Sequence, residues 1–145
     1  CLEANIAGVP AVALSQALDY EIFAGWDENR SISEASMSRL RDSTHRLLGV
    51  AFDKLMKRED WLKDPITWNI NLPIDAADDC RLVSTFLGHA FYGSIFRKRG
   101  DIYVHDVDPP SPDKAELSDT AVIMNGHVSI TRLNLLTFGD KVTIL

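Results

Sequence analysis

A short apolar segment near the start of the chain, residues 10–15, constrains the fold more than any other feature. It reads Pro-Ala-Val-Ala-Leu-Ser and follows Gly8 and Val9. A continuous apolar run of this length is typical of a strand that is buried on both faces, as in parallel sheets. Pro10 fits only at the first position of such a strand, because proline cannot donate a hydrogen bond to a neighbouring strand. The sequence therefore predicts a parallel sheet with covering layers.

The size and charge of the chain limit its function. Its 145 residues, 46% hydrophobic and 25% charged, are typical of one soluble globular domain or part of one. The formal net charge of −6 argues against a nucleic-acid polymer as partner, because binding to a phosphate backbone needs clustered Lys and Arg. No apolar run approaches the length of a membrane span, so we expect no membrane partner. Cys1 and Cys80 form neither a metal-binding spacing nor a disulfide framework, so we expect a reducing, cytoplasmic location.

Residues 33–58 carry the clearest helical pattern. The sequence Ser-Ile-Ser-Glu at 31–34 matches a capping box, with which many helices begin. Apolar side chains then recur every three or four residues, and charged side chains fill the opposite face. The apolar positions are Met37, Leu40, Leu47, Leu48, Ala51 and Leu55. We therefore expect one long amphipathic helix that packs one face against a sheet.

The other predicted elements are shorter. We expect residues 1–7 to be the end of a helix that Gly8 terminates, and residues 17–29 to be a loop. Alternating or branched apolar residues between turn residues predict further strands at 67–72, at 81–86 and, after an Asn-Gly turn, at 126–133.

The segment from 81 to 117 is expected to contain an extended hairpin. Its arms would be residues 90–96 and 101–105, with the basic run 97–100 as the turn between them. A proline-rich linker follows at 108–114, and residues 117–124 form a short element whose type the sequence leaves open.

Three polar residues are our candidates for the wall of a substrate pocket. Ser15 and Gln16 follow the buried strand, and ligands of open α/β sheets collect at the carboxyl ends of parallel strands. His89, next to Gly88 and close to Tyr92, is the histidine that we expect nearest to a site. The chain contains no nucleophile elbow, no phosphate-binding glycine-rich loop and no zinc-binding spacing.

The remaining polar clusters favour a structural or solvated role. The acidic pair at 78–79 could bind a divalent cation, but it lacks flanking Gly, Ser or Asn, so a solvated loop is favoured. The His-Asp-Val-Asp run at 105–108 and the basic run at 97–99 are expected to be exposed. We expect His45 on the helix surface and His127 in a structural position.

Three stretches, taken in order, resemble one protein family. They read EANIAGVPAVALS at 3–15, WNINLP at 68–73 and, after a Ser-Asp pair at 118–119, GHVSITRL at 126–133. They are similar to segments of the SurE family of survival-protein nucleotidases, which read EG…GxPAxAxS, Asn-Ile-Asn-Val-Pro and Thr-Asp…Gly-Tyr-Val-Ser-Ile-Thr-Pro-Leu. Members of this family remove phosphate from nucleoside 5′- and 3′-monophosphates.

The resemblance implies a Rossmann-like α/β fold, with parallel-sheet strands, one long helix and an extended β-hairpin that is swapped between the subunits of a dimer or tetramer. It also implies a divalent metal, Mg or Mn, held in the family by an Asp-Asp-Gly motif followed by a Ser and an Asn. This chain contains no Asp-Asp-Gly, and its pair at 78–79 lies in the wrong half. We therefore expect residues 1–145 to be the C-terminal portion of a single SurE-like domain whose N-terminal metal-binding portion is absent. Residues 81–117 would form the hairpin and oligomerisation region.

By this resemblance the full protein is a metal-dependent phosphomonoesterase for nucleoside monophosphates or another small phosphomonoester. This chain alone would hold no catalytic residue, bind no metal and be inactive. It departs from the family at Arg132, where a Pro is usual, and at His127, where a Tyr is usual. Two alternatives stay open: a non-catalytic interaction or oligomerisation module, and a nucleotide-binding regulator that retains the fold without the metal.

Overall fold

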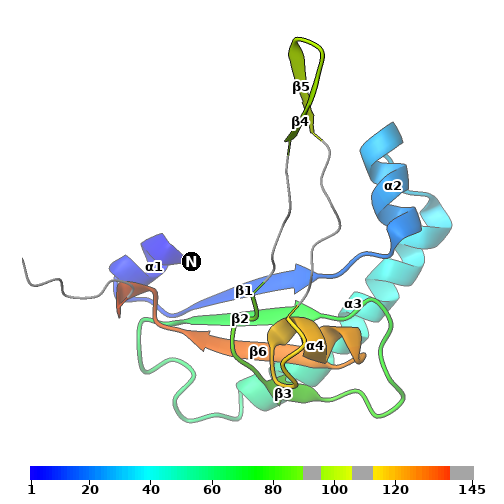
Figure 1. The fold of residues 1–145 in the computed structure, drawn as a ribbon. Helices are drawn as coiled ribbons and strands as arrows, with labels where there is room; N and C mark the ends of the chain where they lie inside the picture. Colours follow the sequence, from blue (N-terminus) through cyan, green and yellow to red (C-terminus); the bar gives the residue numbers. More distant parts are fainter. Residues whose placement is uncertain (90–95, 106–112, 138–145) are drawn as a thin grey trace, which may run out of the picture.

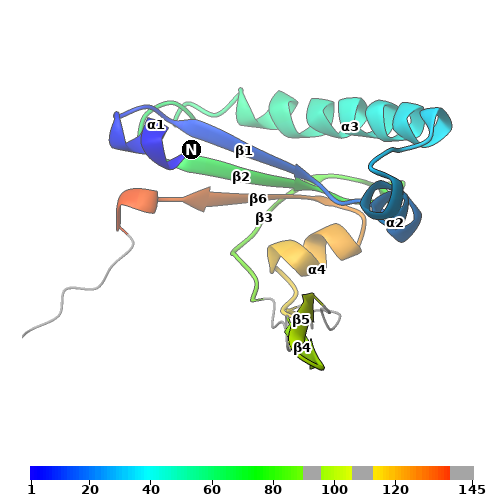
Figure 2. The ribbon, with the colours of Figure 1, turned by 90° about the horizontal axis from the view of Figure 1, so that it is seen from above.

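The computed structural model describes residues 1–89, 96–105 and 113–137. A four-stranded sheet has the long helix α3 on one face and the short helix α4 on the other (Figures 1 and 2). In chain order the elements are α1 (Leu2–Ile6), β1 (Ala11–Gln16), α2 (Tyr20–Asn29), α3 (Glu34–Leu55), β2 (Thr67–Leu72), β3 (Leu82–Ser84), β4 (Phe96–Arg99), β5 (Ile102–His105), α4 (Asp119–Met124), β6 (Val128–Leu133) and the 3-10 helix η1 (Leu135–Thr137). The fold is mixed α/β.

The sheet is mixed, whereas the sequence predicted parallel strands. Its strand order is β1-β2-β6-β3. The strand β1 pairs with β2 in parallel, and β3 pairs with β6 in parallel, but β6 runs antiparallel to β2. The predicted strands at 67–72, 81–86 and 126–133 are all present, the last two in shortened form. No residue pattern within β6 could reveal its direction, because direction depends on the path of the chain between strands.

The strand β1 lies at the edge of the sheet. Every residue in it is half-buried or exposed, and Leu14 is 47% exposed. The expectation of a strand buried on both faces is therefore wrong. The physical reason is that α3 packs mainly on β2, β3 and β6, and α4 on β6 and β2, so in the described part of the chain the helices cover β1 only in part.

One hydrophobic core lies between α3 and the sheet. Leu47, Ala51 and Leu55 of α3 are 0% exposed, because a spacing of four residues places them on one face of the helix. They pack with alternate residues of β2 and β6. The buried residues of this core are Leu47, Ala51, Leu55, Ile66, Trp68, Ile70, Leu72, Val128 and Ile130. The predicted long helix is confirmed, and Ser33 caps it by accepting a hydrogen bond from the backbone N–H of Ser36 (3.1 Å).

Helix α1 stops just before Gly8, as predicted; Gly8 follows the C-cap residue Ala7 and has a φ of +78°, which favours glycine. Its fully buried residue, Asn5, ties the helix to the start of β2. The Asn5 side-chain Nδ2 donates to the carbonyl of Ile66 (3.1 Å), and its Oδ1 accepts from the Thr67 hydroxyl (2.8 Å).

The predicted loop at 17–29 is wrong, because most of it forms helix α2. Asp19 caps this helix by accepting a hydrogen bond from the Ile22 N–H at 2.8 Å. The helix buries only Ile22, and its aromatic side chains Tyr20, Phe23 and Trp26 are exposed. The sequence does carry local signals for this helix, namely the Asp19 cap and the aromatic residues at 20, 23 and 26, which recur every three residues.

The hairpin is present, but its turn lies elsewhere. The strands β4 and β5 pair antiparallel with Arg97 opposite Val104, so the predicted turn at 97–100 is wrong. The chain turns at Gly100, whose φ of +64° suits a tight turn, and at the residue after it. The rest of the predicted arm, 90–95, and most of the predicted linker at 108–114 lie outside the described residues.

The element of open type at 117–124 is helix α4, which begins at the N-cap Ser118. The Ser118 hydroxyl accepts a hydrogen bond from the Ala121 N–H at 3.1 Å. Among the described residues, no helix has both the length and the apolar character needed to cross a membrane.

Candidate functional site

A cleft lies at the point where the parallel strands β1 and β2 end side by side. It has a volume of about 340 Å³, and we refer to it as the strand-end cleft. The start of α2, the first half of α3 and the loop after β2 enclose it. Its lining residues are Ala17, Asp19, Ile22, Arg39, Leu40, Ser43, Arg46, Ile74, Asp75 and Ala76. This is the edge of an α/β sheet at which ligands usually bind.

Helix α3 supplies the polar side of the strand-end cleft. Arg39, Ser43 and Arg46 lie on one stripe of the helix, because they are separated by four and three residues. The Arg39 Nη2 contacts the Asp19 Oδ2 at 3.0 Å. Since Asp19 also caps α2 through its other oxygen, this ion pair holds the Arg39 guanidinium in a defined orientation.

Arg46 is the cation best placed to bind a ligand here. No hydrogen bond or ion pair of its side chain occurs within the described part of the chain, and the side chain is exposed at the cleft. A guanidinium binds the oxygens of phosphate or carboxylate groups with paired hydrogen bonds. Asp75, on the opposite side of the cleft, is acidic and exposed, so the cleft offers both donors and acceptors to a small polar ligand.

Gln16 has a structural role. Its Nε2 donates to the carbonyls of Ala17 (2.9 Å) and Pro73 (2.8 Å), and its Oε1 accepts from the Thr44 hydroxyl (3.1 Å). These bonds use both ends of the amide to tie the ends of β1 and β2 to α3. Gln16 does not line the strand-end cleft, so it supports the site from outside.

Ser15 is exposed on the sheet face opposite α3. Its strand partner is Asn71 of β2, which in turn pairs with Ser129 of β6. The Asn71 Nδ2 donates to the Ser129 hydroxyl at 3.1 Å. These residues form a polar row across three strands. The sequence signal that reveals it is the alternation of Asn with apolar residues in β2 and of Ser or Thr with apolar residues in β6.

His89 lies at the base of the hairpin and is exposed. Its backbone N–H donates to the Asp113 Oδ2 at 3.2 Å, and the Asp113 Oδ1 accepts from the Ala115 N–H at 2.9 Å. Next to it, the Gly88 N–H donates to the Asp119 Oδ1 at 2.8 Å. Two carboxylates therefore join the chain before the hairpin to the chain after it. His89 does not line the strand-end cleft.

The hairpin base should respond to acid. Hydrogen bonds from the N–H groups of Ala115 and His89 lower the pKa of the Asp113 carboxyl below its ordinary value of 3.8. A carboxyl with a lowered pKa stabilises the fold above its ordinary pKa, and this stabilisation is lost as the pH falls through the lowered pKa.

We expect the amide proton resonances of His89 and Ala115 to shift in NMR spectra below pH 3.8. In the Asp113→Asn variant, where this group cannot titrate, that shift should be absent; equal shifts in both proteins would contradict the prediction.

Most of the weaker candidates are placed by the structure. The acidic pair at 78–79 and His45 are exposed, which confirms the surface position expected for His45. His127 is half-buried before β6, and its Nδ1 has no hydrogen-bond partner among the described residues. The basic run at 97–99 lies exposed in β4. Residues 106–108 lie outside the described part of the chain.

The described residues do not fit the divalent metal that the resemblance implies. Within residues 1–89, 96–105 and 113–137, no three His, Cys, Asp or Glu side chains gather in a group that could hold a metal ion.

No family model matches the chain. No curated protein matches it either.

Proposed function

We propose that this chain is the C-terminal part of a SurE-like phosphomonoesterase with a Rossmann-like fold. One observation carries the proposal. The three stretches that resemble the family lie far apart in the sequence, yet their strands β1, β2 and β6 are direct neighbours in one sheet. Segments of one ancestral fold should meet in this way, whereas three chance similarities have no reason to do so.

The proposed role of this chain is to build part of the pocket for a nucleoside monophosphate. The strand-end cleft lies at the carboxyl ends of β1 and β2, where such ligands bind in α/β folds. Arg46, with Arg39 held beside Asp19, provides donors for a phosphate group. A divalent metal held by the N-terminal portion would polarise the phosphoryl group. The proposed location is the cytoplasm, because Cys1 and Cys80 form no disulfide framework.

The hairpin supports the proposed homo-oligomer. The strands β4 and β5 project away from the sheet (Figure 1). Phe96, Ile102 and Tyr103 on them are 57%, 64% and 70% exposed. Apolar side chains on a projecting element are typical of a subunit contact. The same observation supports the alternative, in which the chain is an oligomerisation module without catalysis.

An activity assay tests the proposal. The purified chain should show no Mn-dependent hydrolysis of AMP or p-nitrophenyl phosphate, because its described residues do not gather a metal site. A longer protein that includes the preceding residues should hydrolyse both, and its upstream sequence should contain Asp-Asp-Gly followed by Ser and Asn. The control is a variant of this longer protein in which both Asp residues of the motif are changed to Asn. It should lose the activity.

Other outcomes of these activity and binding assays would distinguish the alternative functions. Metal-dependent turnover by the chain of 145 residues would overturn the proposed division of the domain. AMP binding without turnover in the longer protein would indicate the nucleotide-binding regulator. Neither binding nor turnover, together with an upstream sequence that lacks the motif, would indicate the interaction module.

A further inference from the structure

A second cavity, of about 320 Å³, lies where the last turns of α3 cross β2, β6 and β3. Three cationic side chains and no acidic one line it, although the chain as a whole has a net charge of −6. We refer to it as the basic cleft. Its lining residues are Lys54, Leu55, Arg58, Trp68, Leu82, Ser84, Ile130 and Arg132. The strand-end cleft uses the other half of α3, so the two cavities share no residue.

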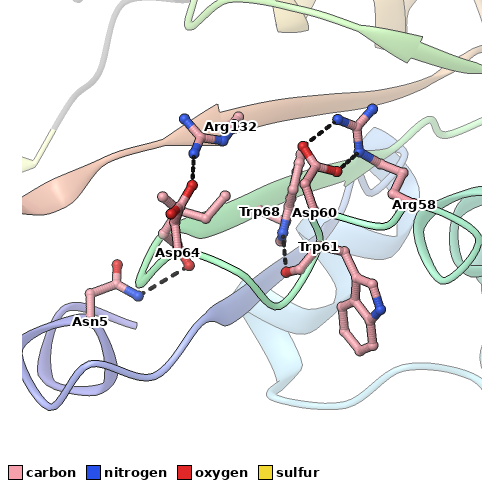
Figure 3. A network of polar contacts seen from close by, with 8 residues as sticks. Asn5, Arg58, Asp60, Trp61, Asp64, Trp68 and Arg132 are labelled. Atoms are coloured by element: carbon pink, nitrogen blue, oxygen red, sulfur yellow. Dashed lines mark hydrogen bonds and ion pairs between the residues drawn. The ribbon is translucent and has the colours of Figure 1, made fainter.

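The floor of the basic cleft is apolar and fixed. Leu55, Trp68 and Ile130 belong to the hydrophobic core and are 0%, 4% and 8% exposed. The Trp68 Nε1 donates to the carbonyl of Trp61 at 3.0 Å, which sets the orientation of the indole ring (Figure 3). The floor is therefore rigid, and the half-buried Leu82 beside it leaves apolar surface on which a flat group can pack.

The two arginines of the basic cleft are held in place by acidic residues outside it. Asp60 accepts from the Nε and Nη2 of Arg58 at 2.8 and 2.7 Å, and Asp64 accepts from the Nη2 of Arg132 at 2.6 Å (Figure 3). The hydrogen bonds with Asp60 also raise the pKa of Arg58. A guanidinium has five N–H donors, so each arginine retains donors beyond those used by its carboxylate.

These ion pairs alone could serve to hold the loop between α3 and β2. That role explains Arg58, Arg132 and their partners, but it does not explain Lys54. Lys54 lines the same cavity, and its side chain has no ion pair or hydrogen bond among the residues that the structure describes. Arg58 also lies over the Trp68 ring, 5.3 Å from its centroid, so a cation and an aromatic surface meet at one place in the cleft.

We propose that the basic cleft binds a small organic oxyanion, with a phosphate or carboxylate head and a flat apolar body. The head would contact Lys54 and the arginine donors, and the body would pack on the floor beside Trp68. Charge-assisted hydrogen bonds orient the head, while burial of the body supplies affinity. This site does not depend on the proposed function, because it shares no residue with the strand-end cleft.

Four probes test the site on the intact chain. Phenyl phosphate and benzoate carry both a head and a ring, inorganic phosphate carries the head alone, and benzyl alcohol carries the ring alone. We expect one of the first two to shift the Trp68 indole N–H resonance in NMR titrations and to bind at least about tenfold more tightly than either partial probe, which is about 1.4 kcal/mol. The tighter of the two identifies the head group.

The variant Lys54→Glu tests which residues bind the head. We expect it to weaken binding of the preferred probe at least about tenfold, since it replaces an attractive charge by a repulsive one. The matched control is Lys57→Glu, which changes the net charge equally but lies outside the cleft and pairs with Asp53 at 2.8 Å. The affinity of the Lys57→Glu variant for the preferred probe should match that of the unaltered chain. No shift of Trp68 with any probe, equal binding of inorganic phosphate, or equal losses in the two variants would each overturn the proposal.

Discussion

Replacing Leu47 with Ala is expected to lower the free energy of unfolding by about 3 kcal/mol. Leu47 is 0% exposed and packs in the core between α3 and the sheet. The change removes buried methyl groups and leaves a cavity that the rigid helix and strands cannot close, so both terms destabilise the fold. Urea denaturation of the two proteins, followed by circular dichroism, measures the difference.

Met37→Ala is the matched control for this prediction. Met37 lies on the same predicted apolar stripe of the helix, but the structure leaves it 38% exposed. Its replacement should therefore cost less than about 1 kcal/mol. Equal losses at the two positions would contradict the placement of the core at the middle and end of α3.

Replacing Gly126 with Ala is expected to cost at least about 2 kcal/mol, from backbone strain and from a direct overlap. The φ of Gly126 is +77°, and an added Cβ would lie 2.6 Å from the backbone nitrogen of Ala77. That nitrogen donates to the Gly126 carbonyl at 3.0 Å, so the loop after β2 rests directly on this turn. The variant should also disturb Asp75, which lines the strand-end cleft and whose carbonyl oxygen lies 3.0 Å from the added Cβ.

Gly8→Ala separates the two causes. Its φ of +78° is nearly the same, but nothing lies within 4 Å of the added Cβ. It should therefore carry only the conformational cost of a left-handed residue, about 1–2 kcal/mol. Thermal unfolding of both variants measures the two losses. A smaller loss of stability at Gly126 than at Gly8 would contradict the prediction, because it would mean that the overlap with Ala77 does not destabilise the fold.

The candidate site shows which features of a binding site can be predicted from residue patterns. Strand position predicted pocket residues at the end of β1, but neither Ser15 nor Gln16 lines the strand-end cleft. Gln16 proves to be a structural tie, and His89 contributes its backbone at the hairpin base. The residues that line the strand-end cleft include Arg39 and Arg46, which in the sequence are two of many charges on a helix. Only the folding of α2 and of the loop after β2 onto α3 distinguishes them.

The residues of the basic cleft are likewise brought together only by the folded structure, and they lie farther apart in the sequence. Lys54 comes from the last turn of α3, Arg58 from the loop after it, Trp68 from the start of β2 and Arg132 from the end of β6. In the sequence, Arg132 is only a departure from the proline usual in the resembling family. Its position in the cleft depends on the antiparallel pairing of β6 with β2, which places Arg132 opposite Trp68.

The sequence by itself determined the long helix, the strand at 67–72 and the helix stop at Gly8. It could do so because periodicity, capping and glycine conformation are local properties, each decided within a few neighbouring residues. The tertiary structure alone decided that β1 is an edge strand, that β6 is antiparallel and which charged side chains share a cavity. These depend on contacts between segments far apart in the chain, and no local pattern specifies them. The two clefts at opposite ends of α3 result from those long-range contacts.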